Sequence, residues 1–584
     1  MINDFERIPV TVIEIDQDRC ALTFSEGACP ATGEPCYNTL ATCKATEAYT
    51  LGDPLTLRFS MADRAEGFDE YVIPNVTNVS TDPTRINVGG RRGREKPLGM
   101  RSQAKVQCVD HPHSDQLVDP YVDQRAYDPL ERSTFWAKWL RRNPYYVNRP
   151  MRIKEGFAGQ ALSEMQTRHY VLDKIDGPDS NGRVNISAQD ILRLADNDKA
   201  KAPALSNGTL LAEYPEESTD PFIVTGGTLA EYTAYGTKAV RLGDEVIRYS
   251  TVTELSNGDL EFSGITRATD GSEQQSHDAE DSVQACLEYV NDNPWDVVYD
   301  LLTEFGGVPA EFCDLSAWAE EGERWLANYP LTRLLTEPEG VTTLLGELSE
   351  QCLFYIWWDE RAQEVRFKAI APALDSVPLL TEQGDILADS VGIKVQPDER
   401  ASEVWVNFLP RDATSDDDKR KEFRRTRARV DPTAASDIEY QERVVYEVFS
   451  RWLTTDTQSS LLALRLLASF RDPPKYLSLS LDVAQRAIGP GESFDIQYRG
   501  FVDDAGLPVP VRYEVISSHE PDNAGRVKIE AIQSIYGVNK RYGRIAPNDT
   551  PVYGSADDDT RASYVFISQN DGTMTNGDDG YQII

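Results

Sequence analysis

The stretch KAVRLGDEVIRYSTVTELSNGDLEFSGITRA, from Lys238 to Ala268, shows the pattern that decides the class of fold. Its polar and apolar residues alternate, as they do in strands that bury one face. Asn257-Gly258 separates two such runs and is a strong signal for a tight hairpin turn. Helical periodicity disappears from about Ala202 to Tyr289. We therefore predict a small all-β insert in this part of the chain.

The region before the insert, from Ile8 to about Ala200, contains short strand-like runs separated by turn residues, with one helix. The helix is predicted to open at Ser133 and to stop at Asn143-Pro144, because proline cannot continue a helix. It presents four large apolar side chains, Phe135, Trp136, Trp139 and Leu140, and we assign its two tryptophans to the core.

The region after the insert mixes helices and strands. Asn293 is a good helix cap, Pro294 suits the first helical position, and an apolar stripe follows as far as Gly306. A second helix over 341–350 leads into LFYIWWDERAQEVRFKAI, which contains two strand-like runs joined by a polar turn. We predict an α+β unit over residues 291–375.

A long helix is predicted from Asp456 to Phe470, before Pro473-Pro474. The run KYLSLSLDV follows it, and its three leucines share one face of a predicted strand. The last fifty residues are rich in Asp, Gly, Asn and Thr, so we expect hairpins and loops at a surface.

Composition limits the classes of function. A chain of 584 residues is too long for one core, so we expect several domains. It has 96 Asp and Glu against 59 Lys and Arg, for a net charge of −37, which disfavours non-specific binding to DNA or to anionic membranes. The start MINDFERIPV is unlike a signal peptide, and no apolar run is long enough to span a membrane. We expect neither secretion by a cleaved signal nor a stable membrane anchor.

Four of the eight cysteines lie close together in the sequence, within the run CALTFSEGACPATGEPCYNTLATC. Thiolates are soft ligands, and four of them complete a zinc site or hold an iron–sulfur cluster. Gaps of eight, six and six residues lack the paired C-x₂-C of typical zinc sites, which favours the cluster, while zinc stays open. The alternative is that they are small buried side chains or form disulfides. The four clustered residues are Cys20, Cys29, Cys36 and Cys43; the scattered Cys108, Cys286, Cys313 and Cys352 are expected in the core.

Motifs for an enzyme are missing from the sequence. It contains no H-E-x-x-H helix, no G-x-x-x-x-G-K-[ST] loop and no G-x-S-x-G elbow. His111 and His113 lie near Cys108 and Asp110, but a solvated turn is favoured over a metal site there. The basic run from Lys419 to Arg429 follows three aspartates, so we interpret it as a solvated loop with self-compensating charge; the alternative is an intersubunit contact.

Several longer runs resemble tail hub proteins of long-tailed bacteriophages and prophages. LGDEVIRYS together with GITRATDGSEQQSHDAEDSV is similar to a β module common in phage tail proteins. NPWDVVYDLLTEFGGVP and RWLTTDTQSSLLALRLLASFRDPPKYLSLSLD resemble the central and later segments of the hub. The N-terminal runs that resemble the hub are CYNTLATC, HPHSDQLVDPYVDQRAYDPLERSTFWAKWLRRNPYYVNRPMRIKEG and MQTRHYVLDKIDGPDSNGRVNISAQDILRLAD.

The resemblance implies a mainly β, multidomain, baseplate-hub-like fold with α+β parts and two β-barrel domains. The expected divisions are an N-terminal Cys-rich metal-binding segment over 1–46, a first hub β-barrel with one helix over 47–200, the all-β insert over 201–290, an α+β hub domain over 291–375, a second hub β-barrel and α+β domain over 376–535, and C-terminal β hairpins and loops over 536–584.

The resemblance also implies a function. We expect a structural virion protein of the tail tip, assembled in the host cytoplasm, and not an enzyme. A homotrimer would close the distal end of the tail tube, adapt it to a threefold tip and open for DNA delivery. In related proteins a cysteine-rich segment holds an iron–sulfur cluster, so the resemblance implies a 4Fe-4S cluster on Cys20, Cys29, Cys36 and Cys43, with zinc as the alternative.

The expected partners are a distal tail protein, a tail fibre or central fibre protein and the tape measure protein. Genomic DNA would pass through the lumen without specific binding. Two other functions stay open: a tail-associated hydrolase of cell wall or glycan, and a receptor-binding tip protein. A turbidity assay on peptidoglycan and direct cell binding would discriminate these from a hub.

Overall fold

The computed structural model divides the chain into two compact units, and each is described by itself. The first comprises Met1–Thr84, Arg101–Leu194 and Trp358–Glu364, and the second Arg85–Met100, Ala195–Trp357 and Val365–Ile584. The structure describes residues 8–62, 68–86, 98–360, 362–373, 377–436, 438–482, 485, 487–519, 526–536, 541–545, 551–566, 574 and 581–583.

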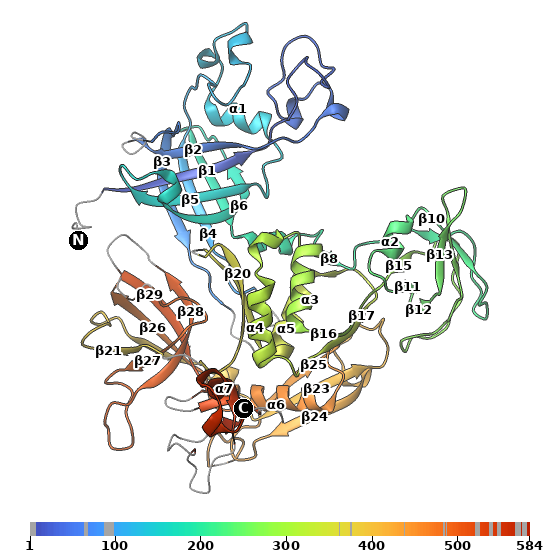
Figure 1. The fold of residues 1–584 in the computed structure, drawn as a ribbon, viewed down its shortest axis with the longest axis vertical. Helices are drawn as coiled ribbons and strands as arrows, with labels where there is room; N and C mark the ends of the chain where they lie inside the picture. The colour runs from blue at the N-terminus through green and yellow to red at the C-terminus, as the bar shows by residue number, and fades with distance from the viewer. Residues whose placement is uncertain are drawn as a thin grey trace. The chain divides into compact units, whose positions relative to one another are not determined.

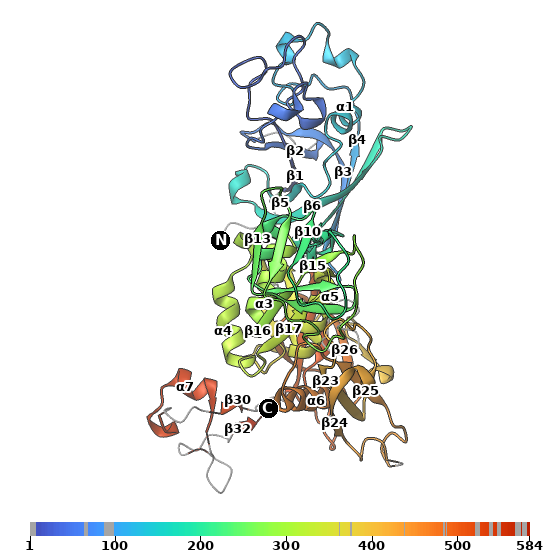
Figure 2. The same cartoon turned by 90° about the vertical axis from the view of Figure 1, so that its right-hand side faces the viewer.

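The first unit contains a closed seven-stranded β-barrel, in the order β1-β2-β3-β4-β7-β6-β5 (Figure 1). The first strand, β1, closes it by pairing antiparallel with both β2 and β5, while β2 and β3 run parallel. Figure 2 shows β3 and β4 side by side, as their antiparallel register requires. The strands are β1 (Pro9–Gln17), β2 (Leu55–Met61), β3 (Ile73–Asp82), β4 (Gln103–Val109), β5 (Pro150–Phe157), β6 (Gln166–Asp176) and β7 (Arg183–Gln189).

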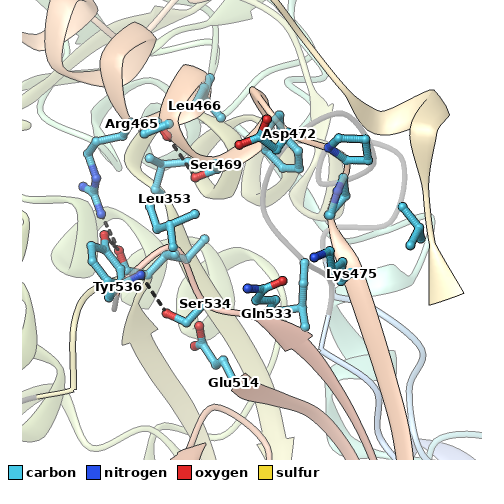
Figure 3. Close-up of a pocket in the computed structure, with 18 of the residues that line it drawn as sticks. Leu353, Arg465, Leu466, Ser469, Asp472, Lys475, Glu514, Gln533, Ser534 and Tyr536 are labelled. Atoms are coloured by element: carbon cyan, nitrogen blue, oxygen red, sulfur yellow. Dashed lines mark hydrogen bonds between the residues drawn. The ribbon is translucent and has the colours of Figure 1, made fainter. Parts of the chain in front are cut away.

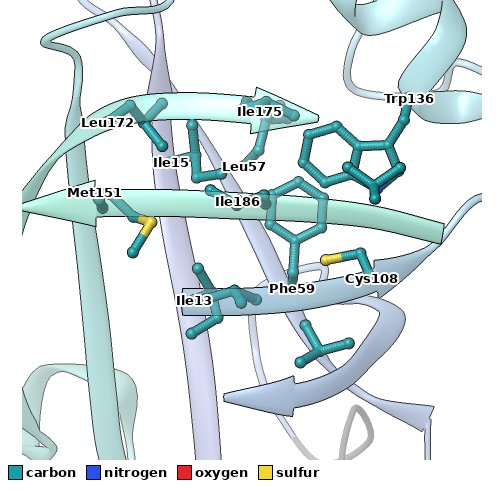
Figure 4. Packing of buried hydrophobic residues seen from close by; sticks show 14 of the residues in the cluster. Ile13, Ile15, Leu57, Phe59, Cys108, Trp136, Met151, Leu172, Ile175 and Ile186 are labelled. Atoms are coloured by element: carbon teal, nitrogen blue, oxygen red, sulfur yellow. The ribbon is translucent and has the colours of Figure 1, made fainter. Parts of the chain in front are cut away.

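The barrel interior is filled by side chains that alternate along the strands, such as Ile13 and Ile15 of β1. Helix α1 (Phe135–Arg142) adds Trp136, which is fully buried and stacks on Phe59 at a centroid distance of 5.2 Å. Figure 4 shows Trp136 reaching from the helix toward Phe59 and Cys108. Trp139 is buried as well, so the assignment of the two tryptophans to the core is confirmed.

Helix α1 begins one residue later than predicted. Ser133 has φ 55° and lies outside the helix, and Thr134 is its N-cap. The carboxylate of Asp110 accepts hydrogen bonds from the Trp136 backbone N–H at 2.8 Å and from the Thr134 hydroxyl at 2.5 Å. A side chain distant in sequence thus satisfies the helix terminus, which local pattern could not indicate.

The position of β1 corrects the predicted N-terminal division. Because β1 is a barrel strand and precedes the cysteines, the cysteine-rich segment is a long connection within the barrel and not a separate N-terminal segment ending at residue 46. Local composition marked the segment, but strand pairing with the distant β5 decided where it belongs.

The predicted all-β insert is confirmed in the second unit. It consists of a four-stranded sheet, β13-β14-β10-β9, and a three-stranded sheet, β12-β11-β15, with one short capped helix α2 (Leu229–Thr233). The predicted hairpin joins β13 to β14, and Gly258 has φ 87° in its turn. The strands are β9 (Thr209–Leu210), β10 (Phe222–Thr225), β11 (Ala239–Leu242), β12 (Glu245–Arg248), β13 (Thr251–Glu254), β14 (Leu260–Ser263) and β15 (Val283–Ala285).

The predicted α+β region is also present, with α3, α4 and α5 side by side in Figure 1. Helix α3 continues as a π-helical turn over Leu301–Phe305 up to Gly306. Asn293 precedes it, but its side chain makes no cap hydrogen bond. The elements are α3 (Pro294–Asp300), α4 (Leu315–Trp325), α5 (Val341–Cys352) and the paired strands β16 (Leu287–Asp292) with β17 (Leu331–Leu335), β18 (Glu339–Gly340) with β8 (Lys201–Ala202), and β19 (Phe354–Asp359) with β20 (Glu364–Ala369).

The expected second barrel is not closed. Its strands form a six-stranded sheet with two free ends, in the order β21-β27-β28-β29-β26-β22. The three leucines of β26 point into its core as predicted. The barrel prediction was wrong here because β21 and β22 do not pair with each other. The strands are β21 (Leu379–Thr381), β22 (Gly392–Val395), β26 (Lys475–Asp482), β27 (Ser493–Gln497), β28 (Val511–His519) and β29 (Arg526–Gln533).

A three-stranded sheet, β24-β23-β25, packs against the predicted helix α6 (Asp456–Phe470). The basic run does not form the solvated loop we expected, because most of it lies in the exposed edge strand β24 (Phe423–Val430). Its charges are partly compensated, as predicted, for example by ion pairs of Arg425 with Asp456 and of Lys419 with Asp417. The other strands are β23 (Glu403–Pro410) and β25 (Val445–Phe449).

The C-terminal region differs from the predicted hairpins in the residues that are described. Strand β30 (Arg541–Ile545) pairs parallel with both β31 (Tyr564–Val565) and β32 (Tyr581–Ile583), and helix α7 (Asp558–Ser563) packs beside them (Figure 2). The rest of this prediction lies outside the described residues. In the part of the chain that the structure describes, no helix is long and apolar enough to cross a membrane.

Candidate metal centre

The four clustered cysteines lie in the connection between β1 and β2, residues 18–54, which we call the cysteine loop. Both ends of the loop are held by the barrel, because Gln17 and Leu55 are paired across β1 and β2. All four thiols are half-buried, and none forms a disulfide. The barrel therefore fixes where the loop leaves and returns, while the loop itself lies outside the sheet.

Cys20 is brought back onto the second half of the loop. Its backbone N–H donates to the carbonyl of Asn38 at 2.9 Å, and a β-bridge joins it to Leu51. The backbone N–H of Leu22 donates to Cys20 Sγ at 3.5 Å. These bonds place the first cysteine beside the segment that carries the third and fourth.

Cys36 is held by an arginine distant in sequence. The guanidinium of Arg125 donates to the carbonyls of Pro35 and Cys36 at 2.6 and 2.7 Å, and it pairs with the buried carboxylate of Asp119 at 2.7 Å. The Tyr37 ring lies between Arg125 and Arg142, whose guanidinium carbons are 4.0 and 3.9 Å from the ring centroid. Polar and cation–π contacts thus hold the chain around Cys36.

Cys29 and Cys43 are positioned by tight turns. The N–H of Cys43 donates to the carbonyl of Leu40 at 3.1 Å and closes the short 3₁₀ turn Leu40–Thr42. The N–H of Cys29 donates to the carbonyl of Glu26 at 3.0 Å. Nearby, the Phe24 N–H donates to the hydroxyl of Tyr121 at 2.8 Å. All four cysteines thus lie on the one connection between β1 and β2.

The four thiols interact electrostatically. Burial raises the pKa of the Cys36 thiol, and the negative charges of Cys43, Cys29 and Cys20 raise it further. Burial also raises the pKa of Tyr121, and the charges of Cys36, Cys29 and Cys20 add to this effect. A negative charge on any of the other three thiols therefore disfavours ionisation of Cys36.

The donor set fits a soft metal or an iron–sulfur cluster, since it offers four thiols that form no disulfide and a backbone N–H directed at one sulfur. Across the described ranges, however, no three His, Cys, Asp or Glu side chains are arranged closely enough to hold a metal ion as they stand. The chemistry of the ligands is suitable, and the four sulfur atoms would have to move together to share one centre.

The other candidate ligands have structural roles. The scattered cysteines are buried as predicted, and burial raises the pKa of Cys108 and of Cys286 to about 12. His113 is also buried, which corrects the expected solvated turn: its Nδ1 accepts from the Asp115 N–H at 3.0 Å. In the insert, buried His277 bonds Glu245 at 2.9 Å.

Sequence reasoning found the four cysteines but missed the residues that place them. Arg125, Asp119 and Arg142 come from the region before and within α1. Arg125 lies 90 residues after Pro35 and 89 after Cys36 in the chain, and Arg142 lies 103 residues after Thr39. Their types are common and follow no motif. The cluster of cysteines was visible because its residues are rare and close in sequence, whereas its supports are neither.

Comparison with known proteins gave structural similarity only. No protein-family description and no curated protein matches the sequence. Among solved structures, the chain is similar to a tail protein from Neisseria meningitidis MC58, with 10% identity over 78% of this chain and 96% of that chain and a TM-score of 0.33.

Two further solved structures give the same kind of match. The 43 kDa tail protein of prophage MuSo2 from Shewanella oneidensis is 8% identical over 79% of this chain and 98% of that one, with a TM-score of 0.33. The E. coli c3393 protein, a type VI secretion component with structural similarity to T4 tail proteins gp27 and gp5, is 8% identical over 86% and 85%, with a TM-score of 0.31. The chain thus has structural similarity to phage and prophage tail proteins and to hub-like proteins.

Proposed function

We propose that this chain is the structural hub at the tail tip of a tailed bacteriophage. Three copies close the distal end of the tail tube, adapt it to a threefold tip and open for delivery of the genome. The distal tail protein, a central or tail fibre protein and the tape measure protein are its neighbours. The chain acts by assembly and conformational change and catalyses no reaction.

The observation that supports this proposal is the combination of domains. A closed seven-stranded barrel and an open six-stranded β-sheet occur in one chain with an α+β region and an all-β insert. This is the set of parts that the sequence resemblance implies for a hub, with one barrel left open. The segments that carry the resemblance occur in the elements that build it, including α1, α3, α6 and β26.

Native mass spectrometry of the purified chain, and of tail tips that contain it, tests the proposal. We expect a complex of three copies of the 65.3 kDa chain. A stable hexamer, or a monomer within assembled tips, would contradict it. Clearing of a peptidoglycan suspension by the pure chain would instead support the hydrolase, and binding of the isolated chain to cells would support the receptor-binding protein.

We further propose that Cys20, Cys29, Cys36 and Cys43 hold a 4Fe-4S cluster, with zinc as the alternative occupant. Support comes from four half-buried, disulfide-free thiols on one loop and from the N–H directed at Cys20 Sγ. A bound cluster would cross-link the loop, and its binding free energy would add to folding because the unfolded chain has no such site.

Iron, sulfide and zinc analysis of protein purified without oxygen tests this assignment. Iron and sulfide in equal amounts would support the cluster, and zinc alone would support the alternative. The absence of all three from anaerobically prepared protein would show that the cysteines are structural, without affecting the proposal of a hub.

A further inference from the structure

The second unit contains a cavity of about 640 Å³ between the outer face of the six-stranded sheet, the end of α6 and β19. Part of its lining is apolar, including Leu353, Leu466 and Ile532. Figure 3 shows Glu514 at one side of this cavity, with its carboxylate directed toward Ser534, and Arg465 reaching in from α6 on the opposite side.

Glu514 is buried in the cavity by the alternation of strand β28. Its neighbours Tyr513 and Val515 point into the sheet's own core, so Glu514 must point to the opposite face, where the cavity lies. Its side chain is 6% exposed. Most residues at such a position are apolar, because burying a carboxylate without a partner is costly.

No partner for this carboxylate is found within the part of the chain that the structure describes. Glu514 takes part in no hydrogen bond and no ion pair there, unlike Glu347 of α5, which binds Arg333. Its oxygens are not among the fully buried side-chain oxygens that lack a partner, so the carboxylate is accessible from the cavity. A group from outside the unit would supply the missing interaction.

The nearby cations are engaged elsewhere. The Lys368 ammonium group on β20 donates to the carbonyl of Gly491, and the Arg465 guanidinium donates to that of Ile370. Lys475 lies at the exposed rim of the cavity. A ligand that pairs with Glu514 would therefore not need to displace an existing ion pair.

We propose that this cavity binds an alkylammonium ion, with the cationic nitrogen on Glu514 and the carbon chain along the apolar lining. The ligand is either a free aliphatic amine or a lysine side chain of a partner protein. The combination of a buried carboxylate acceptor and an apolar wall selects this chemistry over an anion or a neutral polar molecule.

The charge state of Glu514 should make binding depend on pH. Burial raises its pKa to about 7; the Lys368 charge opposes this rise and the Glu321 charge adds to it. Burial raises the pKa of Tyr355 well above its usual value. The other ionisable groups that line the cavity are Tyr440, Arg465, Asp472, Lys475 and Tyr536. A cation binds the ionised carboxylate, so its affinity should rise about tenfold between pH 6 and 8.

Titration of the full chain with n-butylammonium, followed by ligand-observed NMR at pH 8, tests the proposal. We expect Glu514→Gln, which keeps the size and removes the charge, to weaken binding at least about tenfold. The matched control is Asp472→Asn at the exposed rim, where solvent screens the charge and we expect less than about a twofold change. 1-Butanol, of nearly the same shape but neutral, should bind weakly to every variant.

A lysine tripeptide with blocked ends distinguishes the two sources: binding at least as tight as that of butylammonium indicates a protein side chain, and its exclusion indicates a free amine. Equal binding of butylammonium and butanol, or an unchanged affinity in Glu514→Gln, would overturn the proposal. If the variant fails to fold, a wild-type affinity for butylammonium that is constant from pH 6 to 8 would overturn it too.

Discussion

The cysteine loop connects two strands of the barrel, β1 and β2, yet different forces hold the loop and the barrel. The barrel buries a continuous set of apolar side chains around Trp136 and Phe59, and its backbone is paired strand by strand. The loop has few large apolar residues, and one of them, Leu40, is 43% exposed. It is held by hydrogen bonds and cation–π contacts, many of them from Arg125.

This difference indicates which part needs a ligand. Burial of apolar area stabilises by roughly 25 cal/mol per Å², so a barrel filled with aromatic and branched side chains can be stable by itself. A loop ordered mostly by polar contacts, with little apolar burial, gains little against the entropy of fixing its backbone. A metal or cluster bound to the four thiols would supply the stabilisation that the loop lacks because it has no apolar core.

Trp136→Ala should have the largest effect, because it removes the biggest fully buried side chain from the barrel. We expect the free energy of unfolding of the barrel to fall by about 3–5 kcal/mol, since the cavity left behind cannot fully collapse. Hydrogen exchange of the β1 and β6 amides measures it. Leu140→Ala, at a partly buried position of the same helix, should cost clearly less. A loss below about 1 kcal/mol would show that the helix is not part of the barrel core.

Cys36→Ser should affect the loop and spare the barrel. It replaces a soft thiolate with a poor ligand of similar size, so we expect loss of bound iron or zinc and faster proteolysis between Cys20 and Cys43. Exchange in the barrel strands should stay as in the wild type. Metal analysis and limited proteolysis measure both effects.

The control for that change is Cys352→Ser, at a fully buried position in α5, which should leave the metal content unaltered. Retention of full metal by the Cys36→Ser protein would remove that residue from the proposed ligands.

Arg125→Lys should loosen the loop by a smaller amount. Lysine keeps the charge but cannot bond two carbonyls and a carboxylate at once, so local opening should become easier by about 1–3 kcal/mol. Hydrogen exchange of loop amides such as that of Tyr37 reports this. Arg132→Lys, where the guanidinium lies over the Tyr127 ring, is the matched control and should have little effect. Equal exchange in both variants would argue against Arg125 as the support of the loop.

Leu40→Ala should have the smallest effect, below about 1 kcal/mol, because nearly half of the side chain is already exposed. Thermal unfolding and loop proteolysis should both stay close to the wild type. A large loss would mean that the loop has an apolar core of its own, and the contrast with the barrel would fail.

Much of the fold could be predicted from local pattern. The helix from Asp456 to Phe470 has the bounds predicted for it, because a capping residue precedes it and two prolines follow it closely. The hairpin that joins β13 to β14 was also predicted correctly, because Asn257-Gly258 is a local turn signal. The predicted second barrel failed because closure depends on whether the end strands β21 and β22 meet, and no local pattern reports that.

The sequence by itself determined several short-range features: four of the helices, the hairpin at Gly258, the mostly β character of the insert and the four clustered cysteines. These depend on residues within about one turn or one hairpin of each other, so their signals lie in adjacent letters. Only the tertiary structure decided that β1 belongs to the barrel, that Arg125 supports Cys36, and that Glu514 faces a cavity without a partner. Those facts depend on contacts between residues distant in sequence, which chain folding brings together and which residue type alone does not specify.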